Sequence, residues 1–431
     1  ENVGVMCSTP AACTYGVLGG LRVDGDAKTA AAAMRFLSEE DSTRIKRLRE
    51  RYVRPSSLTP SAAKLAGVNA GTRVSASRLE SFFSCPYRHY FSYILGLRKR
   101  REAKPEPADF GTLIHAVLEK FFALYKRGGG NDGNLGRVTQ RCFDESVAEN
   151  DTVKTVADEP SVGRILERIR AEASAACRAL YAAAQRSEYR PEYMEVYIGG
   201  KEIPALEVDC GDGSRAELRG KIDRVDRLGD KFYIVDYKSY ASASFSFGDI
   251  YCGTKIQLYL YMEAIAECKG WTPVGVFYLP LSFDFTDGGA SYRYSGSVTA
   301  DRDEARKIDP LFGAEESERE KYGEGAQCIL PYHPGRSRDF PPPHNLGEEQ
   351  FRTVGRYVRA LAGKGAGDIK GGVIAPRPVG SACKYCDFRT ACAWCDKGVC
   401  TCGSVSLEDF ETGVDAPRGK VMFSAEKGDE E

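Results

Sequence analysis

The chain has 431 residues, of which 42% are hydrophobic and 28% charged, and its 60 Lys and Arg against 61 Asp and Glu give a net charge of −1. This apolar content is enough for a packed core, which excludes a disordered protein. No run of residues in the sequence approaches the roughly 18 consecutive apolar positions of a membrane-spanning helix. We therefore expect a cytoplasmic protein without a membrane partner.

The secondary structure can be predicted in chain order from periodicity and composition. Apolar residues at helical spacing predict helices at 75–95, 110–127, 161–187, 254–268 and 348–361. Runs rich in β-forming residues predict strands at 195–198, 217–228, 231–239 and 273–281. The first helix ends in a basic run, 98–101, which together with Arg88 could contact phosphates or form a solvated surface.

The segments outside these elements indicate the domain organisation. Residues 1–72 carry no recognisable chemistry, and residues 281–345, rich in charge, Gly and Pro, are expected to be an insertion. Residues 404–431 are expected to be a charged tail. Residues 73–403 then remain as one domain that contains all the motifs described below.

The cysteines are unevenly spaced. Six of the 15 lie between residues 383 and 402, in the pattern Cys-x2-Cys-x5-Cys-x2-Cys-x4-Cys-x-Cys. Nothing else in the sequence suggests secretion, so the pattern favours ligation of a metal or a cluster over a disulfide framework. Apart from Cys85, the isolated cysteines are expected to be small buried residues.

The two strands around Gly229-Asp230 carry the most informative pattern. These two residues suit a two-residue hairpin turn, in which paired positions have numbers that sum to 459. Asp223 then lies opposite Asp236, and Lys238 shares the face of Asp236. Two directly opposed carboxylates, with Cβ atoms about 5 Å apart, repel each other unless a cation lies between them.

This arrangement has the chemistry of metal-dependent phosphodiester hydrolysis. Carboxylate oxygens bind Mg²⁺ or Mn²⁺, which activates water and neutralises the phosphate, and a nearby lysine can orient that water. We therefore expect Asp223, Asp236 and Lys238 to be catalytic. The alternative is a hairpin whose charged side chains face water. Lys221, opposite Lys238, could be a second catalytic cation, but a phosphate contact or a surface residue is the favoured interpretation.

These residues also resemble a known family. Gly220-Lys221-Ile222-Asp223-Arg224, followed by Val235-Asp236-Tyr237-Lys238, is similar to the core motif of the PD-(D/E)xK nuclease superfamily in its RecB-like branch. Gly111-Thr112-Leu113-Ile114-His115 resembles the upstream helix of that branch, and Gln257-x3-Tyr261 its downstream helix. The chain departs from the superfamily's name in that no Pro-Asp precedes the carboxylates.

The resemblance implies a fold and a set of roles. The fold is α/β, a restriction-endonuclease-like core in which helices flank a mixed central sheet, with helical and loop insertions. His115, Asp223 and Asp236 would bind the metal with the carbonyl of Tyr237. Three further residues would assist: Gln257 and Tyr261 in binding nucleic acid, and Glu195 as a supporting carboxylate.

The cysteine cluster resembles that of the iron-sulfur nucleases within this branch. There a fourth cysteine precedes the first nuclease motif, the place that Cys85 occupies in Cys85-Pro86-Tyr87. The resemblance implies a [4Fe-4S] cluster that staples the two ends of the domain; its ligands would be Cys85, Cys383, Cys386 and Cys392. The alternative is zinc held locally, with Cys395 replacing Cys85. Cys395, Cys400 and Cys402 have no role in the cluster interpretation.

The whole set of motifs most resembles the C-terminal nuclease region of the B subunit of AddAB-type helicase-nucleases. This implies a metal-dependent DNA exonuclease, preferring single strands, that works with an ATP-driven partner subunit on DNA ends during double-strand break repair by recombination. Residues 1–72 would be the trailing part of a helicase-like region. Two alternatives are a standalone iron-sulfur exonuclease of the CRISPR-adaptation type and a non-catalytic DNA-binding scaffold.

Overall fold

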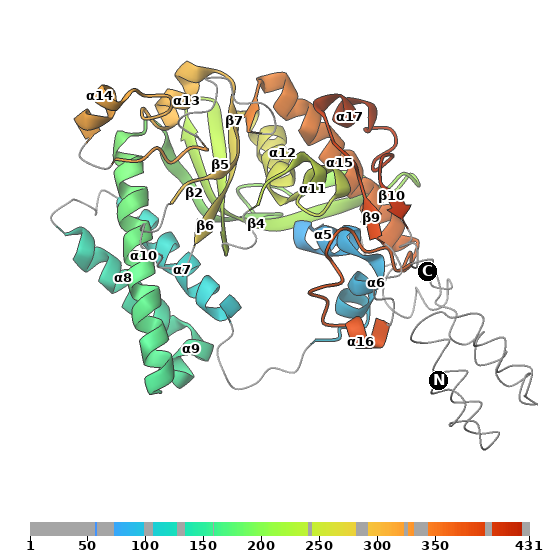
Figure 1. The fold of residues 1–431 in the computed structure, drawn as a ribbon, viewed down its shortest axis with the longest axis horizontal. Helices are drawn as coiled ribbons and strands as arrows, with labels where there is room; N and C mark the ends of the chain where they lie inside the picture. Colours follow the sequence, from blue (N-terminus) through green and yellow to red (C-terminus); the bar gives the residue numbers. More distant parts are fainter. Residues whose placement is uncertain are drawn as a thin grey trace, which may run out of the picture.

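The computed structural model describes most of the chain from residue 73 onward (Figure 1). The described residues are 57, 73–98, 107–126, 134–157, 159–239, 244–281, 292–322, 326–331, 344–392 and 399–424. The expectations for residues 1–72 apart from Ser57, for the basic residues 99–101, and for Cys395 therefore fall outside the described part. Among the described residues, no helix is long and apolar enough to cross a membrane.

The centre of the fold is a mixed eight-stranded sheet in the order β1-β4-β5-β6-β7-β8, in which β2 and β3 also pair with β4. The pairs β5–β6, β1–β4 and β7–β8 are parallel, and the others are antiparallel. The strands are β1 (Arg73–Ser75), β2 (Arg190–Ile198), β3 (Leu206–Asp209), β4 (Arg215–Leu228), β5 (Lys231–Ser239), β6 (Thr272–Leu281), β7 (Ser295–Thr299) and β8 (Asn345–Leu346).

Helices cover both faces of this sheet, and a small antiparallel ribbon of β9 (Val399–Thr401) and β10 (Met422–Ser424) lies near the C-terminus (Figure 1). The longer helices are α5 (Ala76–Ser84), α7 (Pro107–Lys126), α8 (Leu135–Glu149), α10 (Pro160–Arg186), α12 (Gln257–Lys269) and α15 (Glu348–Lys370). The shorter ones are α6 (Pro86–His89), α9 (Asp151–Val156), α11 (Phe247–Cys252), α13 (Arg302–Ile308), α14 (Glu316–Arg319), α16 (Arg389–Cys392) and α17 (Leu407–Thr412). A π-helix (Tyr90–Ile94) continues α6, and a 3-10 turn (Glu320–Tyr322) follows α14. This is the mixed sheet flanked by helices that the sequence predicted.

Alternation along β5 divides the core into two layers. Phe232 and Ile234 pack with α5, α12 and α15 on one face of the sheet. Tyr233, Val235 and Tyr237 pack with α7, α8 and α10 on the other face. Successive side chains of a strand point to opposite faces, so a residue's position in β5 decides which helices it meets.

The hairpin of β4 and β5 has the predicted register. Leu228 pairs with Lys231, and the pairing continues to Arg224 opposite Val235, so that each pair sums to 459. Gly229 has φ 62°, a left-handed conformation that favours glycine at this position of the turn. The ladder ends there, one step before Asp223 and Asp236, so these two residues lie where the strands separate.

Two segments differ from expectation. Residues 281–345 are not simply an irregular insertion, because β7 in this segment pairs with β6 and extends the sheet. The residues expected to form a charged tail are folded up to residue 424. Phe410 of α17 is fully buried and its ring lies 5.0 Å from that of Phe247 and 5.0 Å from that of Tyr357. Phe410 therefore anchors the C-terminal segment to the core. The sequence did not indicate this contact, because most of the residues around Phe410 are charged or polar.

Candidate active site

The candidate site lies where the β4–β5 ladder ends, and the helices of both sheet faces contribute to it. Asp223 comes from β4 and Asp236 from β5, while His115 comes from α7 and Gln257 from α12. Since α7 and α12 belong to different layers of the core, the separation of the two strands is what allows side chains from both layers to meet.

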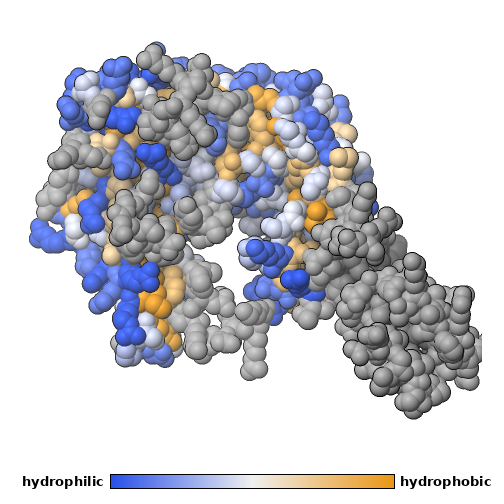
Figure 2. Space-filling view, in the orientation of Figure 1, coloured by the Kyte–Doolittle hydropathy of each residue, from blue (hydrophilic) through white to orange (hydrophobic). Residues whose placement is uncertain are grey.

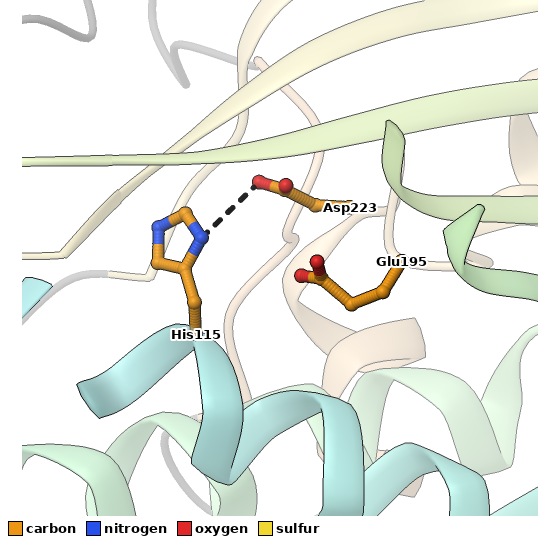
Figure 3. Close-up of side chains that lie close together, drawn as sticks. All are labelled: His115, Glu195 and Asp223. Carbon is orange, nitrogen blue, oxygen red and sulfur yellow. Dashed lines mark ion pairs between the residues drawn. The ribbon is translucent and has the colours of Figure 1, made fainter. Parts of the chain in front are cut away.

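Three side chains form a group with the geometry of a metal site. The ligand atoms of His115, Glu195 and Asp223 all lie within 4.8 Å of one another (Figure 3). Nδ1 of His115 is 3.5 Å from Oδ2 of Asp223. One imidazole nitrogen and two carboxylates are donors that suit Mn²⁺ or Mg²⁺. The structure thus brings Glu195, which the sequence suggested only as a supporting residue, into the centre of the site.

The backbone of Glu195 is unusual. Its φ is 51°, in the left-handed region, although it lies within strand β2 and is not glycine. The neighbouring pairs are Met194 with Arg224 and Val196 with Ile222, so Glu195 occupies the position across from Asp223. A left-handed non-glycine residue costs of order 1 kcal/mol, and such strain is concentrated at functional sites. Lys221 forms an ion pair with the carboxylate of Glu195.

The ionisation of Asp223 and His115 is set by burial and by neighbouring charges. Burial and the carboxylate of Asp236 raise the pKa of Asp223 to about 8, although the backbone N–H of Tyr237 donates a 2.7 Å hydrogen bond to its Oδ2. Burial and the ammonium group of Lys238 lower the pKa of His115 to about 4. A nearby cation would therefore stabilise the ionised carboxylate of Asp223. His115 is neutral, which is the form in which imidazole binds a metal.

Asp236, Lys238 and Gln257 form a closed triangle beside this group. Nε2 of Gln257 donates to Oδ1 of Asp236 at 2.5 Å, and Nζ of Lys238 donates to Oε1 of Gln257 at 3.0 Å. Nζ of Lys238 is also 2.7 Å from Oδ2 of Asp236, but this buried oxygen receives no well-aligned hydrogen bond from the described residues. Burial lowers the pKa of Lys238, but nearby carboxylates, Asp236 foremost, outweigh it, so the pKa is raised.

Tyr237 and Tyr261 occupy different positions relative to the site. The backbone of Tyr237 hydrogen bonds to both Asp223 and His115, so its main chain is adjacent to the candidate metal ligands. Tyr261, predicted to contact nucleic acid, is only 4% exposed. A Cβ at Gly220 would lie 2.6 Å from its hydroxyl oxygen. This close approach explains the glycine and indicates that Tyr261 supports β4.

Glu80 of α5 is a residue near the site that the sequence did not single out. Its Oε1 accepts hydrogen bonds from the backbone N–H groups of Ile256, at 2.8 Å, and Gln257, at 2.9 Å. These N–H groups at the start of α12 have no partner within the helix, so Glu80 fixes the end of the helix that carries Gln257. Burial raises the pKa of Glu80 to about 7. Its position on the polar face of α5 gave no indication of this role.

The four predicted cluster ligands line one cavity. Cys85, Cys383, Cys386 and Cys392 surround it, with Tyr87, Phe91 and Phe388 among the other lining residues. Cys85 is 8% exposed. Burial raises the pKa of its thiol, and the backbone N–H groups of Arg88, Arg377 and Tyr87 hydrogen bond to its sulfur. The structure therefore brings together cysteines nearly 300 positions apart in the sequence.

Two of the three surplus cysteines have packing roles. Cys400 is buried in β9. The sulfur of Cys402 donates to the carbonyl of Gly248 at 3.5 Å and contacts the thiol of Cys252. Cys395 lies outside the described residues.

Comparisons with known proteins agree with this geometry. Residues 73–393 match the model of the PD-(D/E)XK nuclease superfamily. The chain is 27% identical to the B component of the ATP-dependent helicase/deoxyribonuclease of Clostridium novyi (strain NT) over 389 residues, 83% of this chain and 32% of that protein. It is 29% identical to the protein of the same name from Symbiobacterium thermophilum over 383 residues, 78% of this chain and 31% of that protein. The chain spans about a third of the length of these relatives. With the family model matched over most of its length, the chain belongs to the PD-(D/E)XK nuclease superfamily.

Proposed function

We propose that this chain is a metal-dependent deoxyribonuclease that hydrolyses phosphodiester bonds, preferentially in single-stranded DNA, and acts as an exonuclease. One observation carries the proposal. His115, Glu195 and Asp223 converge within 4.8 Å of one another, and Lys238 is held by Asp236 in the same site. Metal ligands and a positioned ammonium group are the two components that hydrolysis of a phosphodiester needs.

The residues present fit a Mg²⁺ or Mn²⁺ ion. His115, Asp223 and Glu195 would hold it, with Asp236 and the carbonyl of Tyr237 as further oxygen donors. Two observations support this fit: the raised pKa of Asp223, which adjacent positive charge would lower, and the buried Oδ2 of Asp236, which lacks a well-aligned donor among the described residues. When bound, the ion supplies positive charge to the scissile phosphate and lowers the pKa of a water molecule.

The chain's own residues position the reacting groups. Lys238 places an ammonium group beside Asp236, where it can hydrogen bond to the attacking water or to a phosphate oxygen. The water oxygen forms the new bond to phosphorus, the phosphorus–oxygen bond of the leaving nucleotide breaks, and a proton passes to the released oxygen. Gln257 holds the orientation of Lys238 throughout, because its amide bonds to Asp236 and to Lys238 at the same time.

The names of the relatives suggest the biological setting. Both are named as the B component of an ATP-dependent helicase/deoxyribonuclease. By analogy, this chain acts in the cytoplasm with an ATP-driven helicase partner subunit on DNA ends, in double-strand break repair by recombination. The proposal for the partner rests on the names alone, whereas the proposal for the chemistry rests on the site.

A [4Fe-4S] cluster is the second proposed cofactor. The four cysteines share one cavity, and Cys85 is buried with backbone N–H groups directed at its sulfur, an environment that suits a cluster thiolate. Bound there, the cluster would join α5 and α6 to the segment that precedes β9. Its loss would release that segment from the nuclease core.

The test of the function is cleavage of a labelled single strand by the metal-free chain with Mg²⁺, Mn²⁺ or EDTA. We expect cleavage only when metal is added. Asp223→Asn should abolish cleavage while DNA binding in EDTA is retained. Binding without any metal-dependent cleavage by the wild-type chain would instead identify a DNA-binding scaffold.

A further inference from the structure

A polar groove lies along α5, the helix whose Glu80 hydrogen bonds to the start of α12. Its empty space measures about 1190 Å³, open solvent at its mouth included. One wall is the polar face of α5, where Ser77, Ser81 and Ser84 recur at helical spacing opposite the buried Leu79 and Phe83. The other wall is formed by residues beside the cysteine cavity and by the end of the π-helix. In Figure 2, hydrophilic side chains gather over the part of the molecule that carries α5 and α6.

The groove collects hydrogen-bond donors that have no partner within the described part of the chain. The hydroxyl groups of Ser77, Ser81 and Ser84 make no hydrogen bond there, and the guanidinium groups of Arg88 and Arg98 make no ion pair. Several other surface arginines, among them Arg141, Arg215 and Arg306, are paired with carboxylates. A row of such donors beside two such cations fits a chain of phosphate oxygens.

Aromatic side chains lie at the same groove. Tyr93 is 45% exposed and stacks on His89 with ring centroids 5.2 Å apart. Phe388, which is half-buried, also lines the groove and stacks on Phe91 with ring centroids 5.0 Å apart. Exposed aromatic rings beside cations are the features by which proteins hold unpaired bases and their backbone.

Glu80 connects the lining of the groove to the candidate active site by hydrogen bonds. This residue lines the groove and accepts the hydrogen bond from the backbone N–H of Gln257, whose side chain contacts Asp236 and Lys238. Asp387 is the other carboxylate of the groove. The lining of the groove therefore carries two carboxylates, Glu80 and Asp387, and two arginines, Arg88 and Arg98.

We propose that this groove binds the sugar–phosphate backbone of a single DNA strand and guides it between the cysteine cavity and the metal site. The proposal rests on the proposed nuclease function, which it extends by assigning a path for the substrate. Serine hydroxyls on α5 contact successive phosphates, the two arginines neutralise them, and Tyr93 stacks on a base. Only an unpaired strand presents its base faces in this way.

The first test is binding, which does not depend on catalysis. Fluorescence anisotropy with a labelled single strand of about 20 nucleotides in EDTA compares the wild-type chain with the double variant Arg88→Glu/Arg98→Glu and with Tyr93→Ala. We expect the dissociation constant to rise about tenfold or more for the double variant and several-fold for Tyr93→Ala. The matched controls are Arg137→Glu/Arg164→Glu on α8 and α10 and Tyr322→Ala, a tyrosine 46% exposed. These should change the constant less than about twofold.

The second test separates this proposal from the proposed function. In Mg²⁺, the groove variants should raise KM for the long strand and leave cleavage of bis(p-nitrophenyl) phosphate unchanged, because that small diester needs only the metal site. If the folded groove variants bind single-stranded DNA as tightly as the wild-type chain, the proposed substrate path is refuted, even if the wild-type chain cleaves DNA. An equal loss of duplex binding would overturn its selectivity for a single strand. If the wild-type chain does not cleave DNA but the groove variants still lose binding, the proposed nuclease function is refuted while the proposed single-strand binding groove is supported.

Discussion

The side-chain amide of Gln257 donates a 2.5 Å hydrogen bond to Oδ1 of Asp236. The same amide accepts a hydrogen bond from Lys238, so a helix residue fixes both a candidate metal ligand and the ammonium group next to it. Gln257 is itself held by Glu80, which binds its backbone N–H. Side chains that orient ligands in this way typically contribute about 10- to 100-fold to activity or metal affinity.

We therefore predict that Gln257→Ala lowers the rate constant for cleavage by about 10- to 100-fold while the DNA dissociation constant changes little. Gln140→Ala, which removes the same side chain from α8 on the other side of the molecule, is the control and should leave the rate unchanged. Single-turnover kinetics measures this rate. A large change in DNA affinity with an unchanged rate would instead place Gln257 in substrate binding.

The strained backbone at Glu195 gives a second prediction. Glu195→Gln should lower metal-dependent activity by about 100-fold, because a ligand charge is lost from the site. Glu195→Gly should lose activity equally but keep or raise the melting temperature, since glycine adopts φ 51° without strain. Thermal melting and cleavage are measured together. Glu192→Gln on the same strand is the control, and a similar loss of activity there would show that any charge change in β2 is harmful.

The raised pKa of Asp223 predicts how metal-free stability depends on pH. An unfolded Asp ionises near pH 4, whereas folded Asp223 keeps its proton up to about pH 8. The contribution of Asp223 to the free energy of unfolding is therefore full below about pH 4 and is lost as the pH rises through about 8. Mn²⁺ binds the ionised form, so the stabilisation it provides should grow as the pH rises toward 8.

Thermal melting with and without Mn²⁺, between about pH 6 and about pH 9, measures this dependence. The Mn²⁺-induced rise in melting temperature should increase with pH in the wild-type chain. In Asp223→Asn it should be small at every pH. A constant rise across the range would mean that the ligands are already ionised in the metal-free protein.

The cysteine cavity predicts the behaviour of substituted cysteines. Cys85→Ser or Cys386→Ser should remove iron and visible absorbance and lower the melting temperature, because the segment before β9 loses its attachment. Cys268→Ser, a half-buried cysteine outside the cavity, should keep iron, colour and stability. Iron and zinc analysis of the purified chain measures the content. Stoichiometric zinc in a colourless protein would contradict the cluster.

Much of the site could be predicted from the sequence because it depends on local geometry. A two-residue turn at Gly229-Asp230 determines the register of the hairpin, and alternation along β5 then places Asp236 and Lys238 on one face. The motif around His115 predicted a position beside the carboxylates, and its imidazole lies next to Asp223. These relationships need only strand periodicity and the spacing of a family motif.

The remaining features depend on contacts between distant segments or on departures from regular backbone. Glu195 enters the site because its residue leaves the extended conformation, which no periodic pattern indicates. Glu80 accepts a hydrogen bond from the first residue of α12, Gln257, which lies 177 positions later in the chain. Phe410 anchors the C-terminal segment by packing on rings from two other helices. Such contacts become visible only once the chain is folded.

The most direct test of the central claim is the single-turnover rate of cleavage of a labelled single strand in Mn²⁺, measured for the wild-type chain and for Asp236→Asn. Asp236 is buried and pairs with Lys238, so the substitution keeps the shape of the site but removes a charge that pairs with the lysine and that would help to hold the proposed metal ion. We expect the wild-type chain to cleave and the variant, folded and still able to bind DNA, to lose at least about 1,000-fold in rate. Equal rates for the two proteins would contradict the account.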